Sequence, residues 1–449
     1  MYERRRILEK FEEQKSFVNE KVESGINANR KGAVRITLKN EAGEAIPNYT
    51  VRMVQKTHEF KYGANLFMLD ELETEEKNEK YKDVMSSFGN IATLPFYWNA
   101  TEPRMGHTRY NADSEKLYRR PSIDLCMDFC QKHGIEPREH GLAYPAFFPV
   151  WLVGKSDFEV KSAMERRYSE IAERYASRIP TIEVTNELEW RNWQIPFYES
   201  EELVEYSFKL AEKYFSANQL VINEHTVLCW ADRGIPSDKY FSYIDANIRR
   251  GARIDAIGMQ FHMFKKQDRE YEDTRPYYDP IELYRHMDLY AKFGKPLQVT
   301  EITIPAYSNS SEDEELQAEV IKNLYTIWFS HPAVEQIIYW NMVDGYAHLW
   351  DPDPEKIRRS LGNMSLGENV YYGGLFRFDM TPKPAYYVIK ELFEKKWHTE
   401  TQGVTSENGN ATLMGFYGKY ELEIVSGGKT LKTEIDLQKG KINKFEFII

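Results

Sequence analysis

The chain has 449 residues, about three times the ~150 residues of a typical domain, which predicts one large domain and one small one. Hydrophobic residues make up 42% and charged residues 29%, a balance that excludes a mainly disordered chain. Lys and Arg number 59 against 70 Asp and Glu, and the formal charge of -11 argues against nucleic acid or an anionic membrane as the main partner.

Cysteine usage is sparse. Cys126, Cys130 and Cys229 cannot form a disulfide framework. The first two lie in a helical pattern with no second cysteine pair to complete a metal site. We therefore expect plain buried thiols, and we expect the protein to need no metal or organic cofactor.

Nothing in the sequence resembles a membrane span or a leader. The uncharged run at residues 141–154 is broken by Pro145 and Pro149 and is too short to span a membrane. The first residues, MYERRRILEKFEEQK, lack the apolar core of a secretory signal. These features predict a cytoplasmic protein with no membrane partner, or a secreted one if a native signal has been removed.

The two ends of the chain predict one small β-structure. Residues 1–30 have the pattern of an exposed amphipathic helix. Residues 31–58 contain two strand-like segments, AVRITLKN and YTVRMVQK, around a turn, and residues 399–449 repeat this style with glycine turns. Because each half is too small for a core of its own, we expect a joint β-sandwich. Two separate flaps on the main domain are the alternative.

Residues 59–398 follow a different rhythm, in which short apolar segments recur every 34 to 46 residues. That interval fits one strand, one helix and two loops, and stretches such as 157–176 and 201–215 carry apolar residues at helical spacing. Eight such units predict a closed (β/α)8 barrel. A doubly wound open sheet is the rival, but no glycine-rich phosphate fingerprint follows the first strand. The strand ends are marked by Gly63, Tyr97, Ala143, Glu187, Asn223, His262, Glu301 and Met342.

Polar residues gather at these strand ends, where such barrels have their active sites. Glu187 in IEVTNELEW and Glu301 in LQVTEITI each follow an apolar strand core. Strands four and seven face each other across the barrel mouth, and two carboxylates about 5 Å apart there would suit retaining glycoside hydrolysis. The other polar residues at the strand ends are His140, Asn186, Asn223, Glu224, His225, Gln260 and His262.

The segments TIEVTNE, AIGMQFH, LQVTEITI and GGLFRFDMTPKPAY resemble glycoside hydrolase family 10, the retaining β-1,4-xylanase family, over about residues 60–397. The resemblance implies cleavage of β-1,4-xylosidic bonds in xylan or xylo-oligosaccharides, with Glu187 as acid/base and Glu301 as nucleophile. It also implies that Asn186 binds the sugar 2-hydroxyl and that His262 holds Glu301 ionised and oriented. The further positions that match the family are His140, Asn223, Gln260, Trp340 and Asp344.

The chemistry of the residues supports the same roles. A general acid must hold its proton near neutral pH, and we expect the ring of Trp190 and the charge of Glu301 to favour the protonated form of Glu187. A metal-dependent hydrolase or isomerase is the alternative, although the paired-histidine HxH signature is absent after the first strand. Its ligands would come from His140, His225, His262 and two glutamates.

Departures from the family pattern gather where the sugar would bind. TLPFYW (93–98) replaces an ENEMKW-like run, so Tyr97 and its neighbours stand where polar groups are expected. HGLAYP puts Tyr144 in place of a Trp, and His348 stands near an expected second Trp, with Trp350 displaced from it. We include Tyr97 and Tyr144 among the predicted substrate contacts.

These departures leave two interpretations open. Residues such as Tyr97, Tyr110 and Asn99 take over the missing sugar contacts, or the substrate is shifted. A shifted substrate would be a decorated xylan fragment, a short oligosaccharide or another β-glycoside, because a site that has lost its hydrogen-bonding groups no longer selects the same hydroxyls.

Two binding functions are further alternatives. A sugar-binding barrel without hydrolysis fits poorly, because both glutamates are present. The sandwich could bind carbohydrate through Phe416, Tyr417 and Tyr420, but strand alternation places such residues in a core at least as often. We expect the sandwich to be structural.

Overall fold

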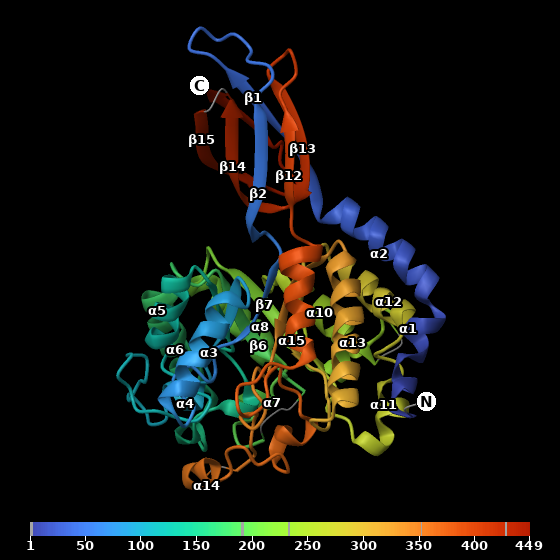
Figure 1. Ribbon diagram of the computed structural model, residues 1–449. Coiled ribbons are helices and arrows are strands. Elements are labelled where there is room, and N and C mark those ends of the chain that lie inside the picture. The colour runs from blue at the N-terminus through green and yellow to red at the C-terminus, as the bar shows by residue number, and fades with distance from the viewer. Residues whose placement is uncertain (1–2, 190–192, 232–233, 352, 427–428) are drawn as a thin grey trace. The chain divides into compact units, whose positions relative to one another are not determined.

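Eight parallel strands close into a barrel in the computed structural model of the chain (Figure 1), which describes residues 3–189, 193–231, 234–351, 353–426 and 429–449. The strand order is β11-β3-β4-β5-β6-β7-β8-β10, and β10 pairs with β11 to close the ring. The two-residue strand β9 follows β8 and pairs with the far end of β10. The predicted (β/α)8 barrel is therefore confirmed, and the open sheet is excluded.

The eight barrel strands are β3 (Lys61–Asn65), β4 (Ile91–Pro95), β5 (Glu136–His140), β6 (Thr181–Asn186), β7 (Gln219–Glu224), β8 (Ala256–Met259), β10 (Leu297–Thr303) and β11 (Val334–Tyr339), and the additional strand β9 is Phe261–His262. All residues of β4, β6 and β10 are buried. Side chains fill the barrel interior and helices cover its outside, so each strand needs apolar residues on both faces.

Helices between the strands begin and end at recognisable signals. Ser156 and Glu159 form a reciprocal capping box at the start of α6. Gly134, with a left-handed φ of 67°, ends α5. The helices are α3 (Glu75–Ser87), α4 (Trp98–Thr101), α5 (Ile123–His133), α6 (Asp157–Tyr175), α7 (Pro196–Glu199), α8 (Glu202–Tyr214), α9 (Thr226–Trp230), α10 (Lys239–Arg249), α11 (Glu270–Thr274), α12 (Pro280–Ala291), α13 (Ser311–Ser330), α14 (Pro354–Arg359) and α15 (Pro384–Glu391).

The chain forms two compact units. The first holds the barrel and consists of residues 1–14, 62–321 and 333–386. The second consists of residues 15–61, 322–332 and 387–449.

The second unit contains a β-sandwich built from both ends of the chain. One sheet has the order β13-β1-β16, and the other has the order β12-β2-β14-β15. The N-terminal strands thus pair with C-terminal strands in both sheets, which confirms the joint sandwich and excludes two separate flaps. The strands are β1 (Lys31–Lys39), β2 (Thr50–His58), β12 (Glu400–Val404), β13 (Asn410–Phe416), β14 (Gly418–Ser426), β15 (Lys429–Leu437) and β16 (Lys444–Ile448).

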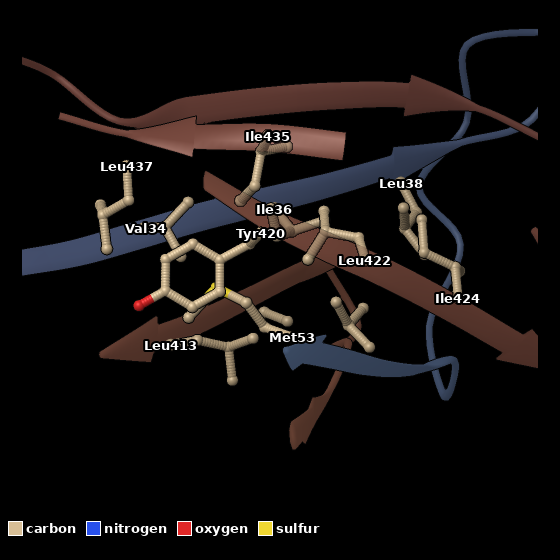
Figure 2. Packing of buried hydrophobic residues seen from close by; sticks show 12 residues of the cluster. Val34, Ile36, Leu38, Met53, Leu413, Tyr420, Leu422, Ile424, Ile435 and Leu437 are labelled. Carbon is tan, nitrogen blue, oxygen red and sulfur yellow. The ribbon is translucent and has the colours of Figure 1, made fainter. Parts of the chain in front are cut away.

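The inner faces of the two sheets form one hydrophobic core (Figure 2). Val34, Ile36 and Leu38 alternate with more exposed neighbours along β1, as expected for a strand with one buried face. Tyr420 is fully buried in this core, and Tyr417 packs against it. These two rings pack in or against the core of the sandwich.

The N-terminal helix expected over residues 1–30 consists of three segments, η1 (Glu3–Leu8), α1 (Glu9–Glu13) and α2 (Lys15–Asn29). Gln14 is the residue between α1 and α2, and its side chain contacts the start of α12. Its side chain donates to Asp279 Oδ1 at 2.9 Å and accepts from the backbone NH of Ile281 at 3.0 Å, so it helps to cap α12. Gln14 therefore binds the end of α1 to the start of α12.

No helix in the described part of the chain combines the length and the apolar character that crossing a membrane requires. Cys126, Cys130 and Cys229 are free, buried thiols, as predicted.

Arg4 ties the N-terminal segment to the loops that follow two barrel strands. Its guanidinium bonds Glu270 at 2.6 and 2.9 Å and Asp313 at 2.6 Å, and it also donates to the carbonyl oxygens of Pro305 and Ala306. All three charged side chains are at least 90% buried. Removing the cation would leave two carboxylates buried without it.

We expect Arg4→Met to lower the free energy of unfolding of the barrel by about 3–5 kcal/mol, because removing one member of a buried ion pair leaves the charges of its partners buried and uncompensated. Arg5→Met is the matched control: Arg5 pairs with Glu319 at 2.8 Å, but both side chains are 41% exposed. An exposed pair contributes less than about 1 kcal/mol. Urea unfolding followed by near-UV circular dichroism measures both, and equal losses would contradict the assignment.

Candidate active site

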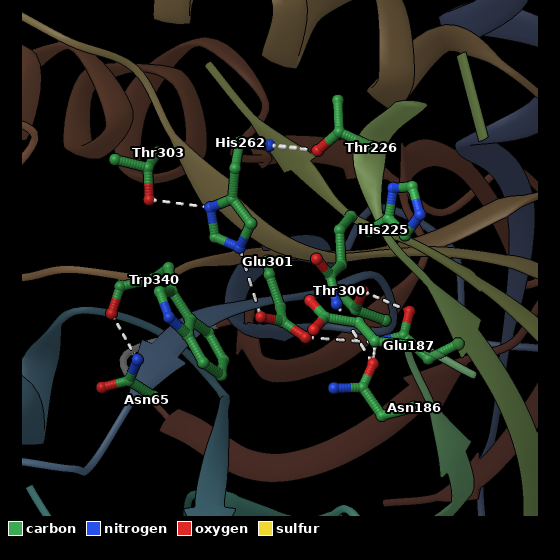
Figure 3. Close-up of polar contacts among 12 residues, drawn as sticks. Asn65, Asn186, Glu187, His225, Thr226, His262, Thr300, Glu301, Thr303 and Trp340 are labelled. Carbon is green, nitrogen blue, oxygen red and sulfur yellow. Dashed lines mark hydrogen bonds and ion pairs between the residues drawn. The ribbon is translucent and has the colours of Figure 1, made fainter. Parts of the chain in front are cut away.

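The predicted polar residues meet at the carboxyl-terminal ends of the barrel strands (Figure 3). Asn186 is the last residue of β6, Glu187 follows it directly, and Glu301 lies in β10. Asn223 lies near the end of β7, and Gln260 lies between β8 and β9. Figure 3 shows the carboxylates of Glu187 and Glu301 next to each other, as a catalytic pair would require.

Glu301 is 3% exposed, and both of its carboxylate oxygens are held. Asn223 Nδ2 donates to Oε1 at 3.1 Å, and His262 Nε2 lies 3.2 Å from Oε2. Burial raises the pKa of Glu301 well above its ordinary value, the charges of Glu183 and Glu187 raise it further, and His140 opposes this. Burial and the neighbouring glutamates therefore disfavour ionisation of Glu301, whereas hydrogen bonds donated to its carboxylate favour it.

Asn223 connects the two candidate catalytic strands. Its amide nitrogen also donates to Asn186 Oδ1 at 3.0 Å, while its oxygen accepts from the hydroxyl of Thr300 at 2.7 Å. Gly258 makes this position possible, since a Cβ there would lie 2.4 Å from Asn223 Oδ1. A glycine inside a strand is the sequence signal for such a close approach.

The amide of Asn186 has a defined orientation. Its oxygen accepts from Asn223 and from Gln260 Nε2, the latter at 3.1 Å. Because two donors fix the oxygen, the NH2 group must be on the opposite side. Within the described residues that NH2 donates to no acceptor. It is therefore available to a ligand hydroxyl.

Glu187 has an unusual backbone conformation. Its φ is +47°, in the left-handed region that non-glycine residues seldom adopt and that marks functional sites. The hydroxyl of Tyr144 donates to Glu187 Oε2, and Glu224 Oε1 accepts from the NH of Leu188 at 2.7 Å. Tyr144 therefore contacts the predicted acid/base directly. Trp190, expected beside Glu187, lies outside the described residues.

His262 is neutral in the folded protein, because burial lowers its pKa to about 4. Its Nδ1 lies 3.0 Å from the hydroxyl of Thr303. If the Thr303 hydroxyl donates to Nδ1, then Nε2 carries the proton and donates to Glu301. We assign this tautomer from the hydrogen-bond network. The expected role of His262 as an orienting partner of Glu301 is thus compatible with a neutral ring.

His140 and Tyr97, both predicted to contact substrate, are buried beneath the site. His140 is 0% and Tyr97 3% exposed, and His140 Nε2 lies 3.0 Å from the Tyr97 hydroxyl. The other ring nitrogen of His140 lies 2.6 Å from Glu183 Oε1. In the described structure the two side chains are hydrogen-bonded to each other, and His140 is also hydrogen-bonded to Glu183.

Glu183 and Arg138 form a buried ion pair next to His140 that the sequence did not reveal. Both are 0% exposed, and Arg138 Nη2 donates to Glu183 Oε2 at 2.5 Å. Burial raises the pKa of Glu183, but His140 and Arg138 lower it more, so that it lies below its ordinary value. A charged residue within the strand TIEVTN was the signal for Glu183, whereas Arg138 lies in the strand EPREH, which is rich in charged residues and gives no such signal.

The remaining predicted residues, Trp340, Asp344, His348 and Trp350, lie in different surroundings. Trp340 is 6% exposed, and its ring centroid lies 5.0 Å from that of Phe67 and 5.2 Å from that of His140. Asp344 is buried against Lys383 at 2.5 Å, away from the catalytic pair in its contacts. His348 packs with Phe147 at a ring-centroid distance of 5.8 Å, and Trp350 is 70% exposed.

One described group could hold a metal ion, and it differs from the predicted set. Donor atoms of His140, Glu183 and Glu301 lie within 4.8 Å of one another. Two of them already pair with each other, and Glu183 also bonds Arg138. His225 is not part of the group, since its Nε2 lies 2.7 Å from Glu189.

The chain is similar to proteins that share this architecture. The model of glycosyl hydrolase family 10 matches residues 68–392. The anti-sigma-I factor RsgI6 of Acetivibrio thermocellus is 25% identical over 413 residues, which are 90% of this chain and 46% of that protein. Endo-1,4-beta-xylanase 2 of Arabidopsis thaliana is 21% identical over 349 residues, 77% of this chain and 28% of that protein. The chain thus spans less than half the length of these two relatives.

A solved structure shows the same fold. Xylanase 10B from Thermotoga petrophila RKU-1 in complex with xylobiose superposes with a TM-score of 0.57 at 20% identity, over 75% of this chain and 95% of that chain. At this level of identity the likeness concerns the fold.

The low pKa of His262 predicts a dependence of stability on pH. The unfolded histidine binds a proton near about pH 6.5, whereas the folded one resists protonation down to about 4. The unfolded state therefore binds more protons in this window, and stability is lost as pH falls through it. From pH 7 to pH 5 the loss from this residue is about 2 kcal/mol.

His262→Gln should remove this part of the pH dependence. The measurement is urea unfolding of both proteins at pH 7 and pH 5, in which the difference between the two pH responses isolates His262. Parallel responses of the two proteins would show that the ring does not titrate in this way.

Proposed function

Since this chain belongs to glycosyl hydrolase family 10, we propose that it hydrolyses β-1,4-xylosidic bonds in xylan or xylo-oligosaccharides by a retaining double displacement. The observation that carries the proposal is the meeting of Glu187 and Glu301 at the ends of β6 and β10. Two adjacent carboxylates, one solvent-accessible and one buried, can divide proton transfer and nucleophilic attack between them.

Glu301 is the proposed nucleophile. Its oxygens receive hydrogen bonds from Asn223 and His262, which orient the carboxylate toward one face of a bound sugar. In the first step one oxygen forms a bond to the anomeric carbon, and the bond to the leaving oxygen breaks. With its pKa lowered to about 4, the histidine is a neutral donor at neutral pH and stabilises the carboxylate without delivering its own proton to it.

Glu187 is the proposed acid/base. It donates a proton to the leaving oxygen in the first step and accepts one from water in the second, when the ester to Glu301 is hydrolysed. The hydroxyl of Tyr144 fixes one of its oxygens and leaves the other for the substrate. The partly exposed position of Glu187 supports this role, since the attacking water must reach it.

Asn186 is the proposed contact to the sugar 2-hydroxyl. Its oxygen is engaged by Asn223 and Gln260, and its NH2 group is therefore presented to the ligand. Such a contact would strengthen as charge develops on the ring in the transition state.

A different β-glycoside is the second candidate substrate. The observation that favours it is an aromatic cluster at the site, in which the partly exposed rings of Tyr144 and Phe147 pack on the buried ring of Tyr97 with ring-centroid distances of 4.6 to 5.8 Å. Apolar rings replace hydrogen-bonding groups here, so the hydroxyls recognised next to the reacting sugar would differ from those of xylan.

Hydrolysis of aryl β-glycosides tests the function: xyloside, xylobioside, glucoside and cellobioside. We expect xylobioside to be cleaved with retention, and the anomer released first, followed by proton NMR, reports the stereochemistry. Preference for another glycoside would keep the carboxylate pair and overturn the xylosidic assignment. Release of the inverted anomer would overturn the double displacement.

Variants of the two glutamates separate the roles. Glu301→Ala and Glu187→Ala should each lower kcat on unactivated substrates by at least ~10²-fold, whereas Glu205→Ala, a glutamate of α8 paired with Lys209, is the control. With azide and an activated aryl glycoside, Glu301→Ala should yield the α-glycosyl azide and Glu187→Ala the β-glycosyl azide. The reverse pattern would exchange the two roles.

A further inference from the structure

Arg120 packs on the aromatic cluster that contacts the proposed acid/base, and it has no carboxylate partner among the described residues. It belongs to the loop between α4 and α5, and its guanidinium carbon lies 3.7 Å from the ring centroid of Tyr97 and 5.3 Å from that of Phe147. The ring of Tyr97 lies 5.8 Å from that of Tyr144, which donates to Glu187. Arg120 is therefore connected to Glu187 through the rings of Tyr97 and Tyr144.

The hydrogen-bonding capacity of Arg120 is largely unused. Among the described residues its side chain donates once, from Nη1 to the carbonyl oxygen of Arg119 at 2.8 Å, and no carboxylate lies within ion-pair distance. Neither Nε nor Nη2 is among the buried, unsatisfied atoms of the described part of the chain. These two donors can therefore be reached from solvent.

The neighbouring arginine adds to the uncompensated charge. Arg119 Nη1 donates to Asn341 Oδ1 at 3.1 Å and to the carbonyl oxygen of Tyr346 at 2.7 Å, both neutral acceptors. Burial, with the charge of Arg119 adding to it, lowers the pKa of Arg120 to about 10, so Arg120 remains charged at neutral pH. Two adjacent cations without a carboxylate are notable in a chain with a formal charge of -11.

We propose that Arg120 binds a carboxylate of the substrate, so that the preferred substrate is a β-glycoside that carries a uronic acid. A planar guanidinium packed against an aromatic ring can present its free N–H groups in the fork that matches a carboxylate. The inference rests on the proposed function, since it names the chemical class of that function's substrate. The carboxylate could come from a uronic acid branch on a neutral chain or from a uronic acid ring within the chain.

Three substrates distinguish these sources. The first is a xylo-oligosaccharide with a glucuronic acid branch, and the second is the same molecule with its carboxylate reduced to a hydroxymethyl group. The third is an aryl β-glucuronide, in which the reacting ring itself carries the carboxylate. The wild-type protein should cleave the acidic branched substrate with a kcat/KM at least ~10-fold above that of its reduced analogue. Preference for the aryl glucuronide would assign the carboxylate to the ring instead.

Arg120→Met should bring the ratio of acidic to reduced substrate to within about 3-fold of one. Arg120→Lys keeps the charge but not the fork and should retain a smaller preference. The matched control is Arg249→Met, which removes a 77% exposed arginine of α10 and changes net charge equally. High salt should weaken the preference of the wild-type protein.

Two outcomes would overturn the inference: equal kcat/KM for the acidic and the reduced substrate in the wild-type protein, or a preference that survives in Arg120→Met. Binding of the same oligosaccharides to Glu301→Gln, measured by calorimetry, is independent of turnover. Tighter binding of the acidic molecule that depends on Arg120 would support the inference even if no xylose-based substrate were hydrolysed, a result that would count against the proposed function alone. Equal binding of both molecules would overturn it.

Discussion

The carboxylate of Glu301 is buried at the end of a strand, and a buried carboxylate must be paired or hydrogen-bonded to be tolerated. Its two oxygens accept from Asn223 and His262. His262 lies in β9, which pairs with the strand of Glu301, whereas Asn223 reaches across from β7, with β8 between them. Each of these donors is in turn oriented by a threonine of the same strand as Glu301, Thr300 for the amide and Thr303 for the ring. One strand therefore supplies the carboxylate and the groups that orient its partners.

A second buried charge lies beneath the first. The charge of Glu183 is compensated by Arg138 and His140. The other ring nitrogen of His140, Nε2, is hydrogen-bonded to the hydroxyl of Tyr97. Through this contact the interior charges of the barrel are connected to the aromatic rings at its mouth. A change at Tyr97 would therefore affect the position of His140, which lies 3.9 Å from Glu301.

The departures from the family pattern become understandable in this setting. Tyr144 replaces an expected tryptophan and bonds the proposed acid/base, and Tyr97 supports Arg120 by stacking. Both substitutions leave the carboxylate pair in place while they change the groups around it. Sugar specificity can thus shift without loss of the hydrolytic residues, because the reacting atoms and the recognised hydroxyls contact different side chains.

The sequence alone determined the barrel, the joint sandwich and the two glutamates at the ends of strands four and seven. Apolar spacing recurs with each strand and helix, and strand ends of a parallel barrel share one face, so local pattern carries this information. It did not reveal Glu183, Arg138 or the unpaired Arg120. Their significance depends on which side chains meet across different strands and loops, and on the burial that makes an uncompensated charge costly. Only the tertiary structure decides those contacts, because residues far apart in sequence contribute to each one.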